Sequence, residues 1–258
     1  MRPYLRPRPV DAPAVRLLAL HHAGGSAAVY HPLARLLPAD WDVVLPDLPG
    51  RGTRAREAPR TELTELVDVV LDQALAWSDE PLALFGHSLG AVVATELARR
   101  LEALGRSPMW LGVSGRVAPA RQDEARQGLH RRSDAEVLAT LGSMGGLPER
   151  LREIPEFTQR FLRTVRADLA AVDSYRPAPD RARLSCPLTV FGGRRDSWAP
   201  VDAIGDWGRE ARSDPARRLF PGGHFYFLGA EFPALASAIA AEVTAAAPRP
   251  GTRREAAA

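Results

Sequence analysis

The sequence predicts an α/β fold in which a mostly parallel central sheet is flanked by helices on both faces. Short apolar runs rich in β-forming residues alternate along the chain with longer segments of helical periodicity. Several of these runs are apolar throughout, as is typical of strands buried on both faces of a parallel sheet. Regular alternation of such strands with helices builds a parallel sheet covered by helices.

The expected elements follow from these runs. We predict strands at residues 15–20, 42–46, 82–85, 109–114, 188–191 and 217–220. We predict helices at residues 29–37, 62–77, 89–104, 201–212 and 232–246. The helix at 89–104 has the clearest signal, because its apolar residues form one stripe and Gly105 suits the position after its end. A length of 258 residues is normal for one α/β domain, so residues 1–258 are treated as a single domain.

Residues 119–180 interrupt the alternation, because they contain no convincing strand. They hold helical patterns at 134–141 and 157–172, with a glycine-rich break at 142–146. The segment is too long for a crossover, and we predict an inserted helical lid that shapes a pocket and excludes water. A purely structural insertion is the alternative. The Pro- and Arg-rich ends, before Val15 and after Ala247, are expected to be loose, and the tail at 248–258 is expected to be disordered.

Composition limits the classes of partner. The chain has no apolar run approaching the roughly 18 residues of a membrane span, and its N-terminus does not look like a signal peptide. One cysteine, Cys186, rules out an internal disulfide, which favours a cytoplasmic location. All 34 basic residues are arginine, but they are spread along the chain and the net charge is only +3. We therefore expect no nucleic-acid or membrane partner and, by default, a monomer.

The stretch FGHSLGAVVA, residues 85–94, places Ser88 between Gly86 and Gly90. It fits G-x-S-x-G, the pattern of a strained strand-to-helix turn that lifts a nucleophilic serine clear of the sheet. The pentapeptide alone is weak evidence, and a plain turn is the alternative. Because it follows a predicted strand and opens a predicted helix, we predict that Ser88 is a nucleophile.

A serine hydroxyl needs a base that is oriented by an acid, and in folds with this turn the chain order is serine, acid, histidine. Asp196 is the only carboxylate in the loop after the predicted strand at 188–191. Asp202 is its nearest rival. His224 follows the last predicted strand and is the expected base, whereas His87 is fixed beside the serine and should point elsewhere.

A tetrahedral intermediate also needs backbone amides that bind its oxyanion. The Leu89 amide lies at the start of the predicted helix, where N–H groups point outward. The second donor is expected from the glycine-rich turn after the first strand, with Ala23 as first choice and Gly24 as second. A tight turn without a catalytic role is the alternative for this segment.

Seven stretches run in the order of one family over nearly the whole chain: HHAGGSA (21–27), LPDLPGRGTR (45–54), GHSLGAVVATELARRLEALG (86–105), VSGRVAP (113–119), ADLAAVDSYRP (167–177), CPLTVFGGRRD (186–196) and PGGHFYF (221–227). In these stretches the chain resembles the discrete type II thioesterases of polyketide and nonribosomal peptide biosynthesis, which are α/β-hydrolases. It departs from the family's pattern where Leu20-His21 replaces Phe-Pro, which could alter packing behind the oxyanion loop, and where Asp47 replaces a frequent glutamine. Neither change touches the predicted triad.

The resemblance implies that the protein removes acyl groups from the phosphopantetheine arm of acyl or peptidyl carrier proteins, clearing chains that stall an assembly line. The triad carries over onto Ser88, Asp196 and His224, and the oxyanion donors onto Ala23 and Leu89. No metal or cofactor is expected, and phosphopantetheine enters only as part of the substrate. The alternatives are a general serine esterase, a product-releasing or cyclising thioesterase and, more remotely, a carrier-binding protein without catalysis.

Two further sets of residues are expected around this site. The acyl tunnel is expected to be lined by Met144, Leu147, Phe157, Phe161, Leu169 and Phe225, with simple packing as the alternative for each. Trp198 and Trp207 are expected in the core. Because carrier proteins are generally acidic, four arginines of the lid segment are expected to assist docking, with a solvated face as the alternative: Arg121, Arg126, Arg131 and Arg132.

Overall fold

The computed structural model describes residues 3–122, 128–147 and 154–247. Within them a seven-stranded sheet has the order β1-β3-β2-β4-β5-β6-β7. All neighbouring strands run parallel except β1, which is antiparallel to β3. The strands are β1 (Tyr4–Leu5), β2 (Val15–Leu20), β3 (Trp41–Pro46), β4 (Leu82–His87), β5 (Trp110–Ser114), β6 (Leu188–Gly193) and β7 (Ala216–Phe220).

Successive side chains of the buried strands point to opposite faces of the sheet, and each face has its own core. In β2, Leu18 and Leu20 belong to one core, whereas Leu17 and Ala19 belong to the other. Strands β2 to β6 are buried along their whole length, which confirms the apolar runs as strands covered on both sides.

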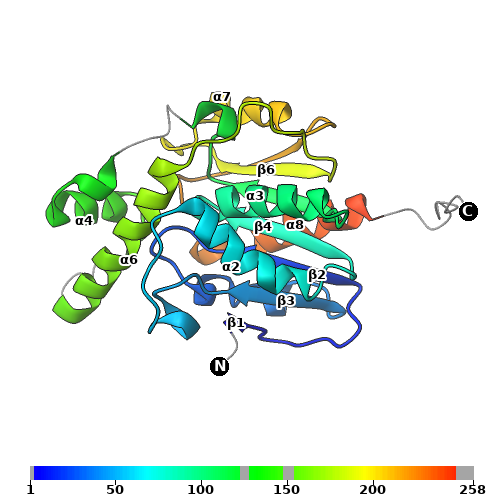
Figure 1. Cartoon of the computed structure of the whole chain (residues 1–258), viewed down its shortest axis with the longest axis horizontal. Helices are drawn as coiled ribbons and strands as arrows, with labels where there is room; N and C mark the ends of the chain where they lie inside the picture. Colours follow the sequence, from blue (N-terminus) through cyan, green and yellow to red (C-terminus); the bar gives the residue numbers. More distant parts are fainter. Residues whose placement is uncertain (1–2, 123–127, 148–153, 248–258) are drawn as a thin grey trace, which may run out of the picture.

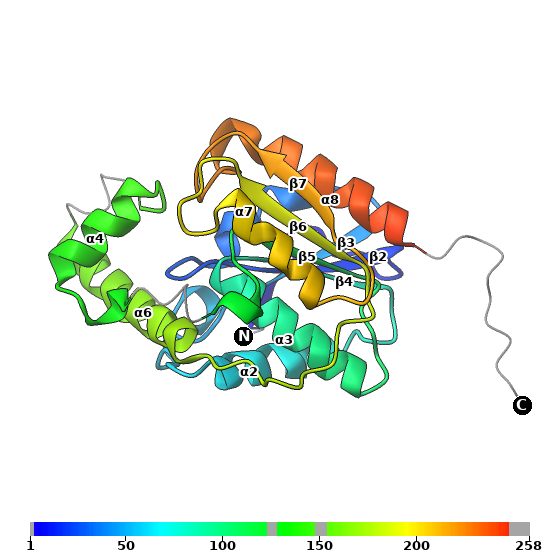
Figure 2. The same cartoon turned by 90° about the horizontal axis from the view of Figure 1, so that it is seen from above.

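Helices cover both faces (Figures 1 and 2). The core that includes Leu18 also takes in residues of α2 and α3, whereas the core that includes Leu17 takes in residues of α1 and α8. Figure 2 shows α8 on one side of the sheet and α2 and α3 on the other. The α-helices are α1 (Leu33–Leu36), α2 (Leu63–Leu75), α3 (Leu89–Ala103), α4 (Asp134–Ser143), α6 (Pro155–Ser174), α7 (Val201–Ile204) and α8 (Phe232–Ala246).

Three details differ from the sequence predictions. The helix expected at 29–37 is a 3-10 turn, η1 (Ala27–Tyr30), followed by the short α1, with Pro32 immediately before α1. The helix expected at 201–212 is α7 followed by a 3-10 turn, η5 (Gly205–Arg209). Strand β1 was not predicted, because its pairing with β3 and the packing of Tyr4 against Trp77 are long-range contacts.

Of the segment between β5 and β6, the described residues 119–122, 128–147 and 154–180 hold helices and turns but no strand. Its helices α4 and α6 lie beyond one end of the sheet (Figure 1). Ser133 and Glu136 form a capping box that starts α4, and Pro155 occupies the first turn of α6. The two helices share a small core that also contacts Ala23 and Trp198 of the main domain.

None of the helices in the described residues is long and apolar enough to cross a membrane. The C-terminal residues 248–258, for which disorder is expected, lie outside the described residues.

Candidate active site

The predicted site residues follow four different strands of the parallel sheet. Ala23 comes after β2, Ser88 after β4, Asp196 after β6 and His224 after β7. Because these strands run in one direction, their carboxyl ends meet at the same edge of the sheet, where open α/β sheets bind ligands.

Ser88 sits in a strained backbone conformation, with φ of 56° and ψ of −114°, and is the only non-glycine residue with positive φ in the described chain. In this turn the backbone passes very close to other backbone atoms at two glycines, Gly86 and Gly90. A Cβ on Gly86 would lie 2.0 Å from the carbonyl oxygen of Gly90, and one on Gly90 would lie 2.1 Å from that of Leu20. Only glycine fits at either position, so the G-x-S-x-G spacing is a steric requirement of the turn.

Asp196 and His224 form a hydrogen-bonded pair, with Nδ1 of His224 2.9 Å from Oδ2 of Asp196. Both residues are buried. The other oxygen of Asp196 accepts hydrogen bonds from the amides of Trp198 and Ala199. Burial alone would raise the pKa of Asp196, but the hydrogen bond and charge of His224, together with the two amides, hold that pKa below its ordinary value. The rival Asp202 is exposed on α7.

Ser88 shares a small cavity of about 20 Å³ with Ala23 and Leu89, the residues predicted to supply the oxyanion amides. Neither of these two amides donates a hydrogen bond to another group of the described chain. Trp198 lines the same cavity, and its ring centroid lies 5.9 Å from that of His224. The expectation for Trp207 is confirmed, since it is in the core, whereas the partly buried Trp198 belongs to the site.

The turn that carries Ala23, residues 21–26, is called the oxyanion turn, and two hydrogen bonds fix its backbone. The Gly25 amide donates to the His22 carbonyl, and the Gly24 amide donates to Oδ2 of Asp168 at 2.7 Å. Asp168 lies on α6 and is fully buried in a two-pronged ion pair with Arg51. The sequence reasoning missed this pair. Two features of the sequence could have revealed this pair. Asp168 falls among the apolar residues of the predicted helix, on the side expected to be buried, and Arg51 stands in a loop otherwise rich in proline and glycine.

Three further histidines, His21, His22 and His87, are buried, and the ring centroid of His87 lies 4.7 Å from that of His224. Burial is the main cause that lowers the pKa of His22 to about 3, assisted by the charges of His224 and Arg51. Burial likewise lowers the pKa values of His21 and His87 well below their ordinary value. His87 is bonded through Nδ1 to Oγ of Ser114 at 2.8 Å, which agrees with the prediction that it points away from a base's position.

The two residues that depart from the family pattern, His21 and Asp47, are both buried and hydrogen-bonded near the oxyanion turn. His21 is buried and accepts a long hydrogen bond from the Leu48 amide at Nε2. Asp47 is also buried and accepts hydrogen bonds from the Ala27 amide and from Thr53. Both side chains therefore fix the loops on which the oxyanion turn rests.

The residues expected to line the acyl tunnel divide into groups. Leu169 lines the cavity with Ser88. Met144 and Phe225 line a separate groove of about 350 Å³ beside the loop of His224. Phe157 and Phe161 stack on each other, and Phe161 packs against the oxyanion turn at Gly24. Leu147 is buried after α4.

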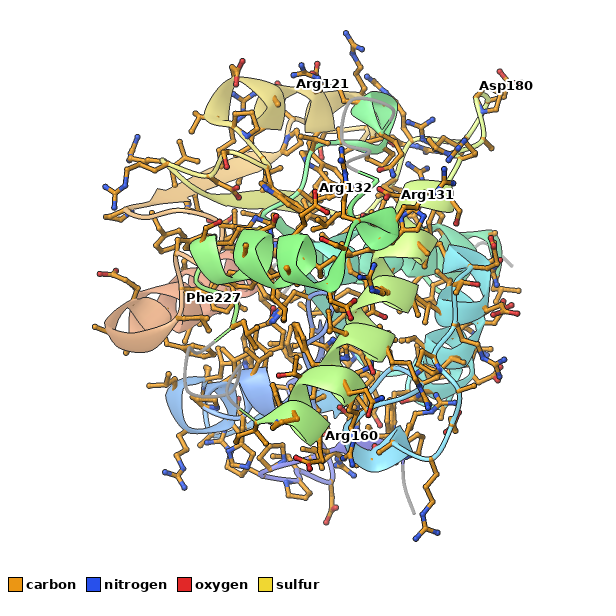
Figure 3. The ribbon with its side chains drawn as sticks, turned by 90° about the vertical axis from the view of Figure 1, so that its left-hand side faces the viewer. Arg121, Arg131, Arg132, Arg160, Asp180 and Phe227 are labelled. Atoms are coloured by element: carbon orange, nitrogen blue, oxygen red, sulfur yellow. The ribbon has the colours of Figure 1, made fainter. Side chains whose placement is uncertain are left out.

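The arginines expected to dock a partner lie on the face formed by α4, α6 and their connections (Figure 3). Arg131 and Arg132 are exposed next to each other, just before α4, and Arg121 lies on the same side. Arg132 is 3.9 Å from Glu136, and Arg121 is 3.4 Å from Asp206, so both carry acidic neighbours. Arg126 lies outside the described residues.

Known proteins of one family match most of the chain. The family model of the thioesterase domain matches residues 15–243. The probable cadicidin biosynthesis thioesterase of Streptomyces griseus is 36% identical over 86% of this chain, and the match spans 60% of that protein's length. The gramicidin S biosynthesis protein GrsT of Aneurinibacillus migulanus is 31% identical over 86% of both chains.

Solved structures give the same result. The type II thioesterase BorB from the borrelidin biosynthetic cluster superposes with a TM-score of 0.85 at 35% identity, covering 93% of this chain and 97% of that one. The thioesterase RedJ from the prodiginine pathway of Streptomyces coelicolor gives a TM-score of 0.81 at 33% identity, covering 92% and 91%. The chain therefore belongs to the thioesterase family and has the α/β-hydrolase fold.

Proposed function

We propose that this protein is a serine thioesterase that hydrolyses acyl groups from the phosphopantetheine arm of carrier proteins in a polyketide or nonribosomal peptide assembly line. The observation that carries the proposal is the shared cavity of Ser88, Ala23 and Leu89 beside the paired Asp196 and His224. The similarity to type II thioesterases of such pathways supports the substrate class.

In the proposed mechanism, Oγ of Ser88 attacks the thioester carbonyl while Nε2 of His224 takes the hydroxyl proton. Asp196, bonded to Nδ1, fixes the ring orientation and stabilises the imidazolium that forms. The amides of Ala23 and Leu89 bind the oxyanion, an interaction whose single donors are typically worth about 10²–10³ in turnover. His224 returns the proton to the departing pantetheine thiol, which leaves an acyl group on Ser88.

Deacylation reverses these roles. His224 removes a proton from a water molecule, the hydroxide adds to the acyl-enzyme, and the proton is passed to Ser88 as the free acid leaves. Every step is assigned to side chains and backbone amides of this chain. The proposal therefore needs no metal or cofactor, and phosphopantetheine takes part only as the leaving group.

Two spaces flank His224 and suggest separate routes for the two halves of the substrate. The enclosed cavity beyond Trp198 suits the start of the acyl chain, with Leu169 of the lid segment in its wall. The open groove on the side of Phe225, whose ring is 5.1 Å from that of His224, suits the pantetheine arm. In this arrangement α4 and α6 act as the lid that excludes water from the acyl group.

The exposed Arg131 and Arg132 lie on the lid face and would meet an acidic carrier domain. Their charge would steer encounter rather than supply most of the affinity. We further propose that the protein works as a monomer in the cytoplasm, where its single buried thiol, Cys186, stays reduced.

The test compares acyl-carrier protein, acyl-pantetheine and aryl oxygen esters with the wild-type protein and Ser88→Ala. We expect thioester hydrolysis by the wild type, no turnover above background by the variant, and irreversible labelling of Ser88 alone by a fluorophosphonate. A strong preference for oxygen esters would replace the proposal with a general esterase, and cyclic products would replace it with a product-releasing enzyme. Absence of labelling would indicate a carrier-binding protein without catalysis.

A further inference from the structure

Arg116 reaches the active-site end of the sheet from β5, a strand to which the proposed mechanism gives no role. Gly115, between β5 and Arg116, has φ of 58°, and a Cβ there would lie 2.3 Å from Cε1 of His87. The chain therefore turns tightly beneath His87 and carries Arg116 to the cavity. Arg116 lines that cavity together with Ser88 and Leu89.

Within the described residues, the guanidinium of Arg116 is buried and forms no ion pair with a carboxylate. Among the described residues three arginines are buried, and Arg16 and Arg51 both form ion pairs with acidic side chains. Arg116 is only 8% exposed, yet its Nη2 donates to the neutral amide oxygen of Gln122 and its Nε has no partner in the described chain. An unpaired buried charge is costly, and this cost indicates a position kept for an anion.

One carboxylate, that of Asp173, lines the same cavity but does not pair with Arg116. Its Oδ2 instead accepts hydrogen bonds from the Gly128 amide at 3.1 Å and lies 2.8 Å from Nδ1 of His130. Burial lowers the pKa of Arg116 to about 10, although the nearby Asp173 and Tyr175 act in the opposite direction. Arg116 therefore stays charged at neutral pH, and its Nε has no partner in the described chain, although the residue lines the cavity.

We propose that Arg116 binds a carboxylate at the far end of a short acyl group, so that the protein hydrolyses carboxyacyl thioesters such as malonyl thioesters. The planar fork of a guanidinium matches a carboxylate with two parallel hydrogen bonds. The phosphate of the pantetheine arm is a poor alternative, because it lies at the opposite end of the arm from the thioester that Ser88 attacks. This inference rests on the proposed function of Ser88.

The cavity also limits the length of that acyl group. Its volume of about 20 Å³ is close to the space of one water molecule. A group that reaches from Ser88 to Arg116 is therefore short, and the side chains of Leu169 and Trp198 must move aside to admit it. A succinyl group would test the upper limit of this length.

The experiment measures kcat/KM for malonyl- and succinyl-pantetheine and for the neutral butyryl- and valeryl-pantetheine, with wild type, Arg116→Gln, Arg116→Lys and the control Arg160→Gln. Arg160 is exposed on α6 (Figure 3), and its replacement by glutamine removes the same unit of charge as Arg116→Gln. We expect the ratio of carboxyacyl to neutral turnover to fall about 50-fold in Arg116→Gln. It should fall less in Arg116→Lys and stay within about twofold in Arg160→Gln.

An unchanged ratio in Arg116→Gln, whether or not both activities decline, would overturn the inference and leave Arg116 a structural residue. Should that variant fail to fold, competitive inhibition of wild type by free malonate, compared with butyrate, decides the matter. Inhibition by malonate that is no stronger than by butyrate would overturn it. Loss of all turnover in Ser88→Ala with an unchanged ratio in Arg116→Gln would refute the carboxylate site while leaving the proposed thioesterase intact.

Discussion

Arg51 and Asp168 form a buried ion pair that joins the loop after β3 to the lid helix α6, with Nη2 of Arg51 2.8 Å from Oδ1 of Asp168. The second oxygen of Asp168 accepts the Gly24 amide, so the same carboxylate holds the oxyanion turn. A single side chain of the insertion thereby fixes the backbone beside Ala23. The lid segment therefore positions the backbone of the oxyanion turn, in addition to its proposed role of excluding water from the site.

Replacing Asp168 with asparagine should therefore affect stability and turnover together. Asp168→Asn leaves Arg51 buried without a counter-charge, and we expect a loss of about 3 kcal/mol in the free energy of unfolding. Release of the Gly24 amide should also lower kcat at least about 10-fold for an acyl-pantetheine. Urea denaturation and steady-state kinetics measure the two effects. The matched control, Glu57→Gln, breaks the partly exposed pair with Arg54 and should change stability by less than about 1 kcal/mol.

The strained backbone at Ser88 should be measurable as lost stability. With φ of 56°, a residue bearing a Cβ is disfavoured, whereas glycine adopts such angles without strain. We expect Ser88→Gly to unfold with a free energy about 1 kcal/mol higher than Ser88→Ala, both variants being inactive. Equal stabilities of the two variants would show that the turn carries no strain at this residue.

The glycines of the same turn should not tolerate a methyl group. In Gly86→Ala the new Cβ would meet the Gly90 carbonyl oxygen at 2.0 Å, and backbone cannot move aside easily. We expect a loss of at least about 3 kcal/mol or an insoluble product. Gly208→Ala is the control, since the nearest atom to its Cβ would be 4.0 Å away. Thermal unfolding of both variants decides the comparison.

The buried histidines should make the protein less stable in mild acid. The pKa of His22 is lowered to about 3, so the unfolded chain, with an ordinary pKa near 6.5, binds a proton that the folded chain excludes. The stabilisation is complete above pH 6.5 and is lost as pH falls toward 3. His22 alone should contribute a decrease of about 2 kcal/mol in unfolding free energy between pH 6.5 and 5.

The His22→Gln variant checks this assignment. The slope of unfolding free energy against pH between 6 and 5 should fall by about 1.4 kcal/mol per pH unit, which corresponds to one proton. The exposed His31 serves as control, and His31→Gln should leave the slope unchanged. A wild-type slope retained in His22→Gln would mean that His22 takes up its proton in the folded state.

The proposed docking face can be tested by charge reversal. Arg131→Glu combined with Arg132→Glu should lower kcat/KM for acyl-carrier protein about 10-fold at low salt, and less at high salt, because steering is screened. Turnover of acyl-pantetheine should stay within about twofold. The control is Arg183→Glu with Arg212→Glu, exposed residues that precede β6 and β7 and lie away from the site. Equal effects from both pairs would refute this docking face.

Much of the fold could be predicted from the sequence, because its signals are local. The runs at β2, β4 and β6 are largely apolar, and each of these strands was predicted within two residues of its observed ends. Helix α8 was predicted with its observed bounds. Predictions were weaker where glycine and proline break a helical pattern, as in α1 and α7, and where pairing is long-range, as in β1.

The positions of Ser88, Asp196 and His224 at the site could be predicted because each follows a recognisable strand, and parallel strands end at one edge of a sheet. Which buried polar side chains meet there became visible only in the folded molecule. Arg51 pairs with Asp168 across 117 residues, whereas Arg116 forms no ion pair among the described residues although Asp173 lines the same cavity. Periodicity and turn motifs predict local structure, because they depend on residues that are neighbours in the chain. The pairing of buried charges depends instead on how elements that are distant in the chain pack together.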